Sequence, residues 1–327
     1  MEQKIDFVVT WVDGSDEAWL KERSKYHMSE GTDVRNMRYR DWDNLQYWFR
    51  AVEQFAPWVN KIHFVTWGHV PSWLNLENPK LNIVKHSDFI PEEYLPVFNS
   101  VAIEVHLHRI QGLSENFVYF CDDFFLMQKC KTTDFFRAGL PTDTCYFEPV
   151  IANVNRDMWH WHLYNDYSIY FKYIEKKQIL KNILKYCNVR YKKSFFTNAL
   201  NICIRNFFIH SLHVPVSLKK ETFKYLWENE HEILQHTAKS RFRSMDNNSL
   251  EMMRGYQLIT GKFKPIHKKL IVVNTSDILF TKSVIEQKNY KYICLNDDTC
   301  DDEFEQSKRE INHSFEHVFP FKSSFEK

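Results

Sequence analysis

Ile5-Asp6-Phe7-Val8-Val9-Thr10-Trp11, closed by Val12-Asp13-Gly14-Ser15-Asp16, is the run that sets the pattern for the chain. Its β-branched and aromatic residues predict a buried strand, and the Asp, Gly and Ser residues after it predict a turn. Asp6 is unusual, because an acid in an otherwise apolar strand is costly to bury unless it is paired or functional. The run therefore indicates an interior strand whose carboxyl end leads into a polar loop.

Strand-like and helix-like runs alternate further along the chain. Strands are expected at residues 61–66, 81–85, 116–121, 270–274 and 291–295, and helices at residues 41–55, 102–110 and within 214–260. This alternation predicts the α/β class, with a mostly parallel sheet flanked by helices. Ligands of such sheets bind beyond the carboxyl ends of the strands. The residues expected there are Thr10, Trp11, Thr66, Trp67, Asp122 and Asp123.

Composition narrows the class of function. The 327 residues carry a formal net charge of +1, so no global field would recruit nucleic acid. The seven glycines form neither a dinucleotide fingerprint nor a P-loop. The start of the chain lacks a signal-peptide core, no stretch has the length of a membrane span, and the seven cysteines include no CxxC pair. These features predict a cytoplasmic protein with reduced thiols.

A basic segment interrupts the pattern. Residues 171–210 hold nine Lys or Arg against one acid, and apolar residues repeat within them at helical spacing. The sequence therefore predicts a core formed by residues 1–150 and 205–327, with a basic helical insertion at residues 151–204. Two interpretations stay open: a solvated helix face packed on the core, or docking to an anionic membrane surface or anionic polymer. The second would place the protein peripherally at the inner face of the membrane.

Paired carboxylates follow two of the expected strands. Asp122-Asp123 come after the strand at residues 116–121, and Asn296-Asp297-Asp298 come after the last strand. Adjacent carboxylates repel unless a positive charge lies near them, and Mg²⁺ or Mn²⁺ takes oxygen ligands and can bridge to phosphate. Asp122, Asp123 and Asp297 are therefore the candidate metal ligands. The alternatives are a helix cap beside a solvated acid, and an acidic turn.

Other candidates are histidines and arginines. Glu104 and His108 have the i,i+4 spacing of one helix face, but without an evident third ligand zinc is disfavoured. His213 could act as a general base beside a hydroxyl substrate, and Arg241 or Arg243 could clamp phosphate. Structural or solvated roles are the alternatives. The residues alone indicate an α/β enzyme that depends on a metal and acts on phosphate.

Four stretches, in order along the chain, resemble the conserved regions of the Stealth family. They are residues 5–16; the stretch from Arg38-Tyr39-Arg40-Asp41 to Tyr119-Phe120-Cys121-Asp122-Asp123; His213-Val214-Pro215 with Ser240-Arg241-Phe242-Arg243-Ser244; and Lys291-Tyr292-Ile293-Cys294-Leu295-Asn296-Asp297-Asp298 with Phe319-Pro320 and Ser323-Ser324-Phe325-Glu326. The family comprises sugar-1-phosphate transferases of bacterial capsule synthesis, related to the animal GlcNAc-1-phosphotransferase that acts on lysosomal enzymes.

The resemblance implies a GT-A-like (Rossmann-like) fold, a UDP-sugar donor such as UDP-GlcNAc, and an oligo- or polysaccharide acceptor. The expected enzyme is a hexose-1-phosphate transferase that forms a phosphodiester and releases UMP, with a possible link to capsule assembly. The family's catalytic positions fall on Asp6, Glu104, His213 and Arg243, with Arg241 competing for the arginine role. Donor contacts are expected at Thr10, Trp11, Arg50 and Arg241. Cys121 replaces an asparagine that the family often has.

Two other functions remain compatible with the sequence. An ordinary GT-A glycosyltransferase would use the same fold and donor but would release UDP. A lectin-like sugar-binding protein would use the many aromatic residues for stacking and would turn over no donor. The paired acids at two strand ends favour an enzyme over a binding protein.

Overall fold

The centre of the fold is a mainly parallel sheet. The computed structural model describes residues 4–26, 32, 38–149, 158–191, 194–204 and 207–327. Over these residues the sheet has five strands in the order β10-β4-β1-β2-β3. They are β1 (Ile5–Thr10), β2 (Ile62–Thr66), β3 (Leu81–Lys85), β4 (Asn116–Cys121) and β10 (Val216–Lys219). The first four are parallel and β10 is antiparallel to β4, so the expected α/β class is confirmed.

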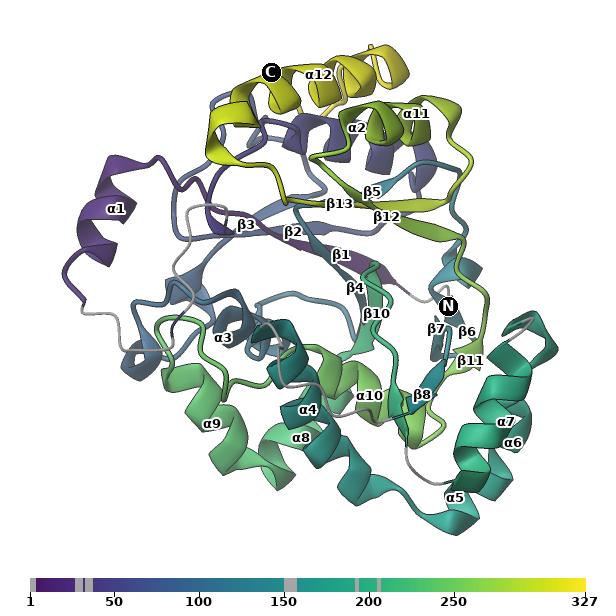
Figure 1. Cartoon of the computed structure of the whole chain (residues 1–327). Helices are drawn as coiled ribbons and strands as arrows, with labels where there is room; N and C mark the ends of the chain where they lie inside the picture. Colours follow the sequence, from purple (N-terminus) through teal and green to yellow (C-terminus); the bar gives the residue numbers. More distant parts are fainter. Residues whose placement is uncertain (1–3, 27–31, 33–37, 150–157, 192–193, 205–206) are drawn as a thin grey trace.

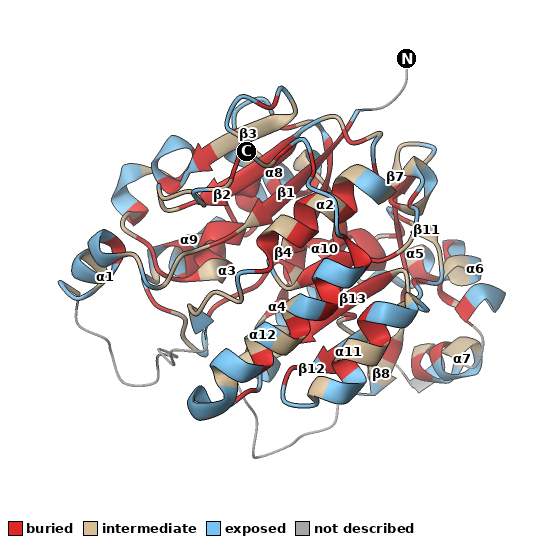
Figure 2. Cartoon of the chain, turned by 90° about the horizontal axis from the view of Figure 1, so that it is seen from above, coloured by how far each residue is buried: buried red, intermediate tan, exposed pale blue. Residues whose placement is uncertain are grey.

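Helices cover both faces of this sheet, which explains why β1 is apolar along its length. On one side lie α2 (Leu45–Phe55), α11 (Ile278–Gln287) and α12 (Asp301–Val318) (Figure 1). On the other lie α3 (Ser100–Glu104), α8 (Lys220–Asn229), α9 (His231–Lys239) and α10 (Glu251–Ile259). Phe7 and Val9 belong to the hydrophobic core that includes residues of α2 and α12, and Val8 belongs to the core that includes residues of α8 and α10. Figure 2 shows the buried strands beneath α2 and α12.

Smaller sheets extend the central one. They contain β5 (Phe124–Leu126), β12 (Leu270–Asn274) and β13 (Tyr292–Asn296); β6 (Phe136–Arg137), β7 (Leu140–Asp143) and β11 (Lys264–Pro265); and β8 (Phe147–Pro149) with β9 (Phe207–Ile209). The last two expected strands, β12 and β13, are present, but they pair with each other, and β13 pairs with β5 and not with the central sheet. Leu295 N donates to Asp123 O at 3.0 Å, so both acidic strand ends lie together.

The helix expected at residues 102–110 is broken. Helix α3 ends at Glu104, and a separate 3-10 turn follows at Leu107–Arg109. Glu104 and His108 therefore do not share a helix face. His108 instead stacks on Phe223 of α8, with ring centroids 5.5 Å apart. Helix α1 (Glu17–Arg23) is capped by Asp16, whose side chain accepts a hydrogen bond from Trp19 N at 2.7 Å.

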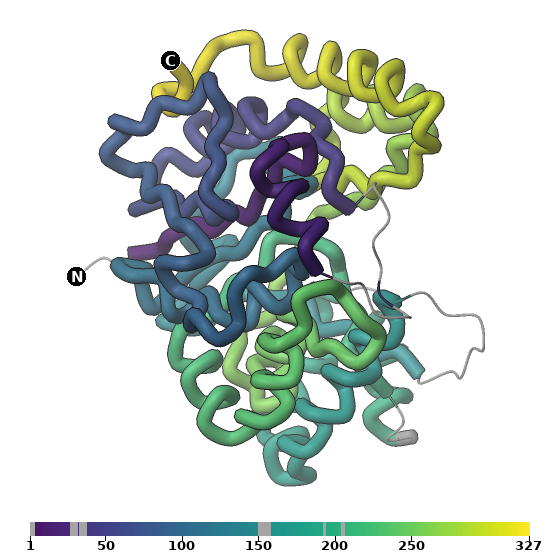
Figure 3. Tube along the Cα trace, turned by 90° about the vertical axis from the view of Figure 1, so that its left-hand side faces the viewer, coloured from purple at the N-terminus to yellow at the C-terminus, as the bar shows by residue number. Residues whose placement is uncertain are grey.

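The predicted insertion is not a separate body where the structure describes it. It forms α4 (Met158–Tyr170), α5 (Lys176–Lys181), α6 (Ile183–Tyr186) and α7 (Ser194–Ile204), while residues 150–157 lie outside the described ranges. Tyr170 packs so closely on Gly255 of α10 that a β-carbon there would meet its ring at 2.4 Å. Ile169 and Tyr186 belong to the same core as α8 and α10. These helices therefore pack on the core, while the division at residues 151–204 stays a prediction; Figure 3 shows the teal and green segments side by side.

No helix among the described residues is both long and apolar enough to cross a bilayer. Each of the seven cysteines is free. The cellular location stays a prediction.

Candidate active site

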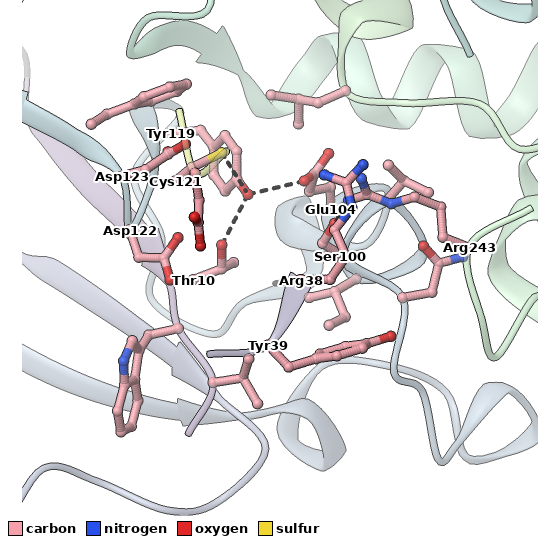
Figure 4. Close-up of a pocket in the computed structure, with 18 of the residues that line it drawn as sticks. Thr10, Arg38, Tyr39, Ser100, Glu104, Tyr119, Cys121, Asp122, Asp123 and Arg243 are labelled. Atoms are coloured by element: carbon pink, nitrogen blue, oxygen red, sulfur yellow. Dashed lines mark hydrogen bonds between the residues drawn. The ribbon is translucent and has the colours of Figure 1, made fainter. Parts of the chain in front are cut away.

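A cavity of about 600 Å³ opens at the carboxyl ends of β1 and β4. This is the edge where ligands of parallel α/β sheets bind, and the size is ordinary for a small-molecule site. Its wall includes Thr10 and Trp11 from β1 and the turn after it, and Asp122 and Asp123 from the turn after β4 (Figure 4). Of the six residues expected at this edge, these four line the cavity, whereas Thr66 and Trp67 do not. Trp11 is buried and stacks on Phe64 at 5.7 Å, which fixes its position in the wall.

The hydroxyl of Tyr119 links the parts of the cavity. It lies 2.9 Å from Thr10 Oγ1 and donates to Glu104 Oε1 at 3.1 Å (Figure 4). Burial raises the pKa of Glu104 to about 7, although Arg243 and the Tyr119 hydroxyl favour its ionised form. Glu104 is therefore partly protonated near neutral pH. Tyr119 was missed in the sequence, although its place two residues before the strand end puts it on the same face as Cys121.

Arg243 reaches the cavity and Arg241 does not. Arg243 Nη2 donates to Ser100 Oγ, and both residues line the cavity (Figure 4). Arg241 instead places its guanidinium 4.8 Å from the ring centroid of Tyr26 and lines a second, smaller hollow. Because residues i and i+2 of an extended segment share a face only when the segment is straight, sequence spacing left this choice open. Arg243 therefore lines the cavity and Arg241 does not, while the donor contact expected at Arg241 stays a prediction.

Asp122 and Asp123 lie on the concave wall of the cavity, where Asp122 is exposed and Asp123 is half-buried. Removal from bulk water raises the pKa of both carboxyls; the charges of Asp123 and Asp41 raise that of Asp122 further, whereas His213 partly offsets the rise at Asp123. Asp122 still faces the open cavity, so water there moderates the effect. Asp123 Oδ1 is buried without a hydrogen-bond partner, while Cys294 Sγ donates to Oδ2 at 3.5 Å. An unpartnered oxygen beside a second carboxylate fits a divalent cation.

Asp297 does not share in that arrangement. Its Oδ2 accepts from Arg40 Nε at 2.6 Å and from Trp42 Nε1 at 3.1 Å, and its Oδ1 accepts from Arg40 Nη2. With both oxygens bonded to cationic or N–H donors, the side chain is already neutralised. Within the described ranges, no group of three or more His, Cys, Asp or Glu side chains forms a ready metal cluster. The structure pairs Asp297 with Arg40, and its expected role as a metal ligand stays a prediction.

His213 lies on the rim of the cavity. It is exposed and has a φ of 45°, a left-handed conformation that is uncommon for residues other than glycine. Its ring contacts Phe124 at 5.8 Å and Trp159 at 5.0 Å between centroids. His213 lines the same cavity as Asp123. Such placement is compatible with the expected general base, which stays a prediction.

Asp6 lies at the opposite end of β1. It is fully buried, and its carboxylate accepts from Asn60 Nδ2 at 2.6 Å and from Ser114 N at 2.7 Å, with His63 Nε2 at 3.1 Å. Burial raises its pKa, but these hydrogen bonds outweigh that effect and hold the pKa below its usual value. Four residues of strand separate it from Thr10, or about 13 Å. Asp6 does not line the cavity, and its expected catalytic role stays a prediction.

Arg50 is also remote from the cavity wall. It extends from α2 to the end of the chain, where Nη2 lies 2.8 Å from Glu326 Oε2 and Nη1 lies 3.0 Å from Glu316 Oε2. Nη1 also donates to Phe319 O at 2.6 Å. Arg50 therefore links α2 to the end of the chain, and the donor contact expected there stays a prediction.

Some cavity residues come from segments that sequence reasoning did not connect with the site. Trp159 and His162 belong to α4, inside the predicted insertion, and Arg38 and Arg40 precede α2. His162 Nε2 lies 2.8 Å from Ser244 O, which ties α4 to the segment that carries Arg243. The available signals were the aromatic-histidine run Trp159-His160-Trp161-His162 and the basic residues before Asp41. Neither signal by itself places a side chain at this cavity.

Fold and cavity together define an α/β protein that offers a ligand site beyond the carboxyl ends of parallel strands. Three Stealth models match it: conserved region 1 at residues 3–31, conserved region 2 at residues 38–143 and conserved region 4 at residues 283–327. The chain belongs to the Stealth family.

Several relatives match over nearly the full length. The chain is 40% identical to a capsular polysaccharide phosphotransferase WcwK of Streptococcus pneumoniae, over 99% of this chain and 98% of that protein. It is 36% identical to the receptor polysaccharide phosphotransferase WefC of Streptococcus oralis, over 99% of both chains. It is 35% identical to the exopolysaccharide phosphotransferase cps2G of Lactiplantibacillus plantarum, over 99% of this chain and 96% of that protein.

A solved structure, the apo form of the glycosyltransferase GlyE of Streptococcus pneumoniae TIGR4, aligns over 97% of this chain and 90% of that chain. The identity is 10% and the TM-score is 0.25, which is too low to identify a shared fold.

Proposed function

We propose that this protein transfers a hexose-1-phosphate, such as GlcNAc-1-phosphate, from a UDP-sugar to a hydroxyl of an oligo- or polysaccharide. The transfer would form a phosphodiester and release UMP during capsular or exopolysaccharide synthesis. Full-length similarity to polysaccharide phosphotransferases supports the class of reaction. The observation that carries the proposal is one cavity in which Asp122 and Asp123 lie across from Glu104 and Arg243 (Figure 4). That pairing of acids with an arginine suits a diphosphate.

The proposed reaction is a displacement at phosphorus. The acceptor oxygen forms a bond to the phosphorus that bears the sugar, and the bond from that phosphorus to the bridging diphosphate oxygen breaks. UMP leaves with the bonding electron pair, and His213 takes the hydroxyl proton. The C1–O bond of the sugar is not broken, so its configuration is retained.

The remaining cavity residues would position the donor. Arg243 would stabilise the charge that develops on the phosphoryl oxygens, and the attraction between Glu104 and Arg243 would orient the guanidinium. Thr10 and Trp11 would form the floor under the nucleotide. Asp122 and Asp123 would hold Mg²⁺ or Mn²⁺, which supplies neutralisation of diphosphate charge when bound.

The nucleotide product tests the proposal. Purified protein incubated with UDP-GlcNAc, other UDP-sugars and an oligosaccharide acceptor should yield UMP and an acid-labile phosphodiester. Release of UDP would instead establish an ordinary glycosyltransferase, and binding without turnover, insensitive to EDTA, would establish a sugar-binding protein.

His213→Ala should lower kcat by about 10²–10⁴, the usual cost of losing a placed general base. His213→Asn is the control for backbone strain, since asparagine tolerates a positive φ. Near wild-type kcat in both variants would remove His213 from the mechanism.

A further inference from the structure

Helix α7 buries polar side chains and exposes large apolar ones. Its buried side presents Asn198 and Asn201, which are 0% and 3% exposed, whereas Phe196 and Leu200 on the opposite side are 75% and 61% exposed. The two asparagines are satisfied inside: Asn198 Nδ2 donates to Cys145 O and Tyr186 O at 2.7 Å each, and Asn201 Nδ2 donates to Phe147 O at 2.7 Å. A water-facing helix would have the reverse pattern.

The neighbouring helices continue the same surface. Leu180 of α5 is 70% exposed, Leu184 of α6 is 79% exposed, and Val189 before α7 is 82% exposed. Figure 1 shows α5, α6 and α7 together at one corner of the molecule. A large apolar side chain that is singly exposed needs no explanation, but four on three adjacent helices, with Val189 in the turn before α7, do. We define this surface, with Leu180, Leu184, Val189, Phe196 and Leu200, as the apolar corner.

Positive charge surrounds the apolar corner. Lys176, Lys177, Lys181 and Arg190 are exposed on the same helices, and residues 176–204 contain no Asp or Glu. Among the described residues, the three lysines form no ion pair, in contrast to Lys172, which lies 2.8 Å from Glu230 Oε2. Lys185 is also engaged, because it donates to Gly261 O. Exposed apolar side chains ringed by unpaired cations match the charge and polarity of an anionic lipid surface.

We propose that the apolar corner docks this protein on the surface of an anionic lipid bilayer. Phe196, Leu200 and Leu184 would enter the boundary between headgroups and acyl chains, while the lysines would contact the headgroup phosphates. Helix α5 follows α4 after one turn, and α4 supplies Trp159 and His162 to the cavity. Docking would therefore hold the cavity at a set height above the bilayer. This surface is separate from the cavity, so the proposal stands independently of the proposed reaction.

Vesicle co-sedimentation of the full chain tests the docking. Binding to phosphatidylcholine vesicles that contain phosphatidylglycerol should exceed binding to phosphatidylcholine alone by about tenfold or more, and should weaken as salt rises. The triple variant Leu184→Ser, Phe196→Ser, Leu200→Ser should lose about tenfold or more in affinity. The variant Lys176→Gln, Lys177→Gln, Lys181→Gln should lose about 10–100-fold on the anionic vesicles and little on the neutral ones.

Leu279→Ser with Phe321→Ser is the matched control, because these residues are 83% and 85% exposed outside the apolar corner. It should bind as wild type does. All the substituted side chains are exposed, so unchanged thermal unfolding and unchanged turnover of free donor should show that the variants fold.

Two outcomes would overturn the proposal. Loss of binding in the lysine variant alone, with the serine variant unaffected, would identify an anionic polymer as the partner. Dimers that form without lipid and disappear in the serine variant, with no vesicle binding, would identify a second copy of this chain.

Discussion

Arg241 and Arg243 are two residues apart in the sequence but lie in different surroundings. Arg243 bonds Ser100 at the cavity, and Arg241 lies over Tyr26 outside it. We predict that Arg243→Ala lowers kcat by about 10²–10³, because a positioned cation at a phosphoryl group is lost. Arg241→Ala should leave kcat near wild type, which makes it the matched control. Equal losses in the two variants would contradict the assignment drawn from the geometry.

The raised pKa values at Asp122 and Asp123 make cation binding depend on pH. Protons occupy these carboxyls to a higher pH than usual, so a cation must displace protons and its affinity should rise with pH. We predict that MgCl₂ raises the Tm of the wild type and that the increase shrinks as pH falls toward the acidic range. Asp122→Asn should abolish the increase and lower kcat, while Asp302→Asn, on the exposed start of α12, should keep both. An unchanged increase in Asp122→Asn would place the cation elsewhere.

The raised pKa of Glu104 makes the stability of the folded protein depend on pH. Its pKa is raised to about 7 by burial, so the folded protein holds a proton that the unfolded chain releases. Stability from this group is therefore present at low pH and is lost as pH rises toward 7. The ionised carboxyls of the cavity therefore lower the stability of the fold near neutral pH, which is typical of functional sites.

At the scale of elements, the two ends of β1 have different functions. Its carboxyl end supplies Thr10 to the cavity, and its amino end is fixed by Asp6, which joins β1 to the segments before β2 and β4. The parallel pairing of β1 with β2 and β4 depends on that junction. An acid that looked catalytic in the sequence therefore aligns the strands that carry the site.

We predict that Asp6→Asn destabilises the protein by about 1–3 kcal/mol, since an amide cannot accept from all three donors. The kcat of the folded fraction should stay near wild type. Because hydrogen bonds hold the pKa of Asp6 below its usual value, its contribution is present above the ordinary aspartate pKa and is lost as pH falls through the depressed one. Urea unfolding at two pH values measures this. Loss of kcat without loss of stability would return Asp6 to catalysis.

At the scale of the whole molecule, the last residues of the chain close one half of the fold. Residues after α12 return to α2 and to the loop before β3, where Lys327 N donates to Trp73 O at 2.9 Å. Arg50 sits at this closure with 9% of its side chain exposed, and Glu326 has 4% exposed. A paired charge at such a site holds segments that are far apart in the sequence.

Arg50→Ala should lower the free energy of unfolding by about 1–3 kcal/mol, because it leaves Glu326 without its partner. KM for the donor should not change. Lys282→Ala, which removes the exposed pair with Glu310, is the control and should cost less than about 1 kcal/mol. A raised KM with unchanged stability would restore the donor contact expected from the sequence.

The local sequence pattern by itself determined the fold class and the position of those site residues that follow strand ends. The apolar strands and their alternation with helices predicted the parallel sheet, and the strand ends predicted that Thr10, Trp11, Asp122 and Asp123 lie at one edge. Such inferences succeed because strand burial and the edge reached by carboxyl ends depend on neighbours in the sequence. Motif resemblance predicted the family, which the matched regions confirm.

Only the tertiary structure decided the partners of each charge. Asp297 meets Arg40, Arg50 meets Glu326, and Arg243 rather than Arg241 enters the cavity, through contacts between residues far apart along the chain. The same holds for α4, whose contribution to the cavity depends on how Tyr170 packs against Gly255. Strand periodicity says which side of an element is buried, but it does not say which distant side chain lies opposite. A charge therefore acquires its role from packing, and the first strand, Ile5–Thr10, carries both a predicted end at the cavity and an anchored end that packing alone revealed.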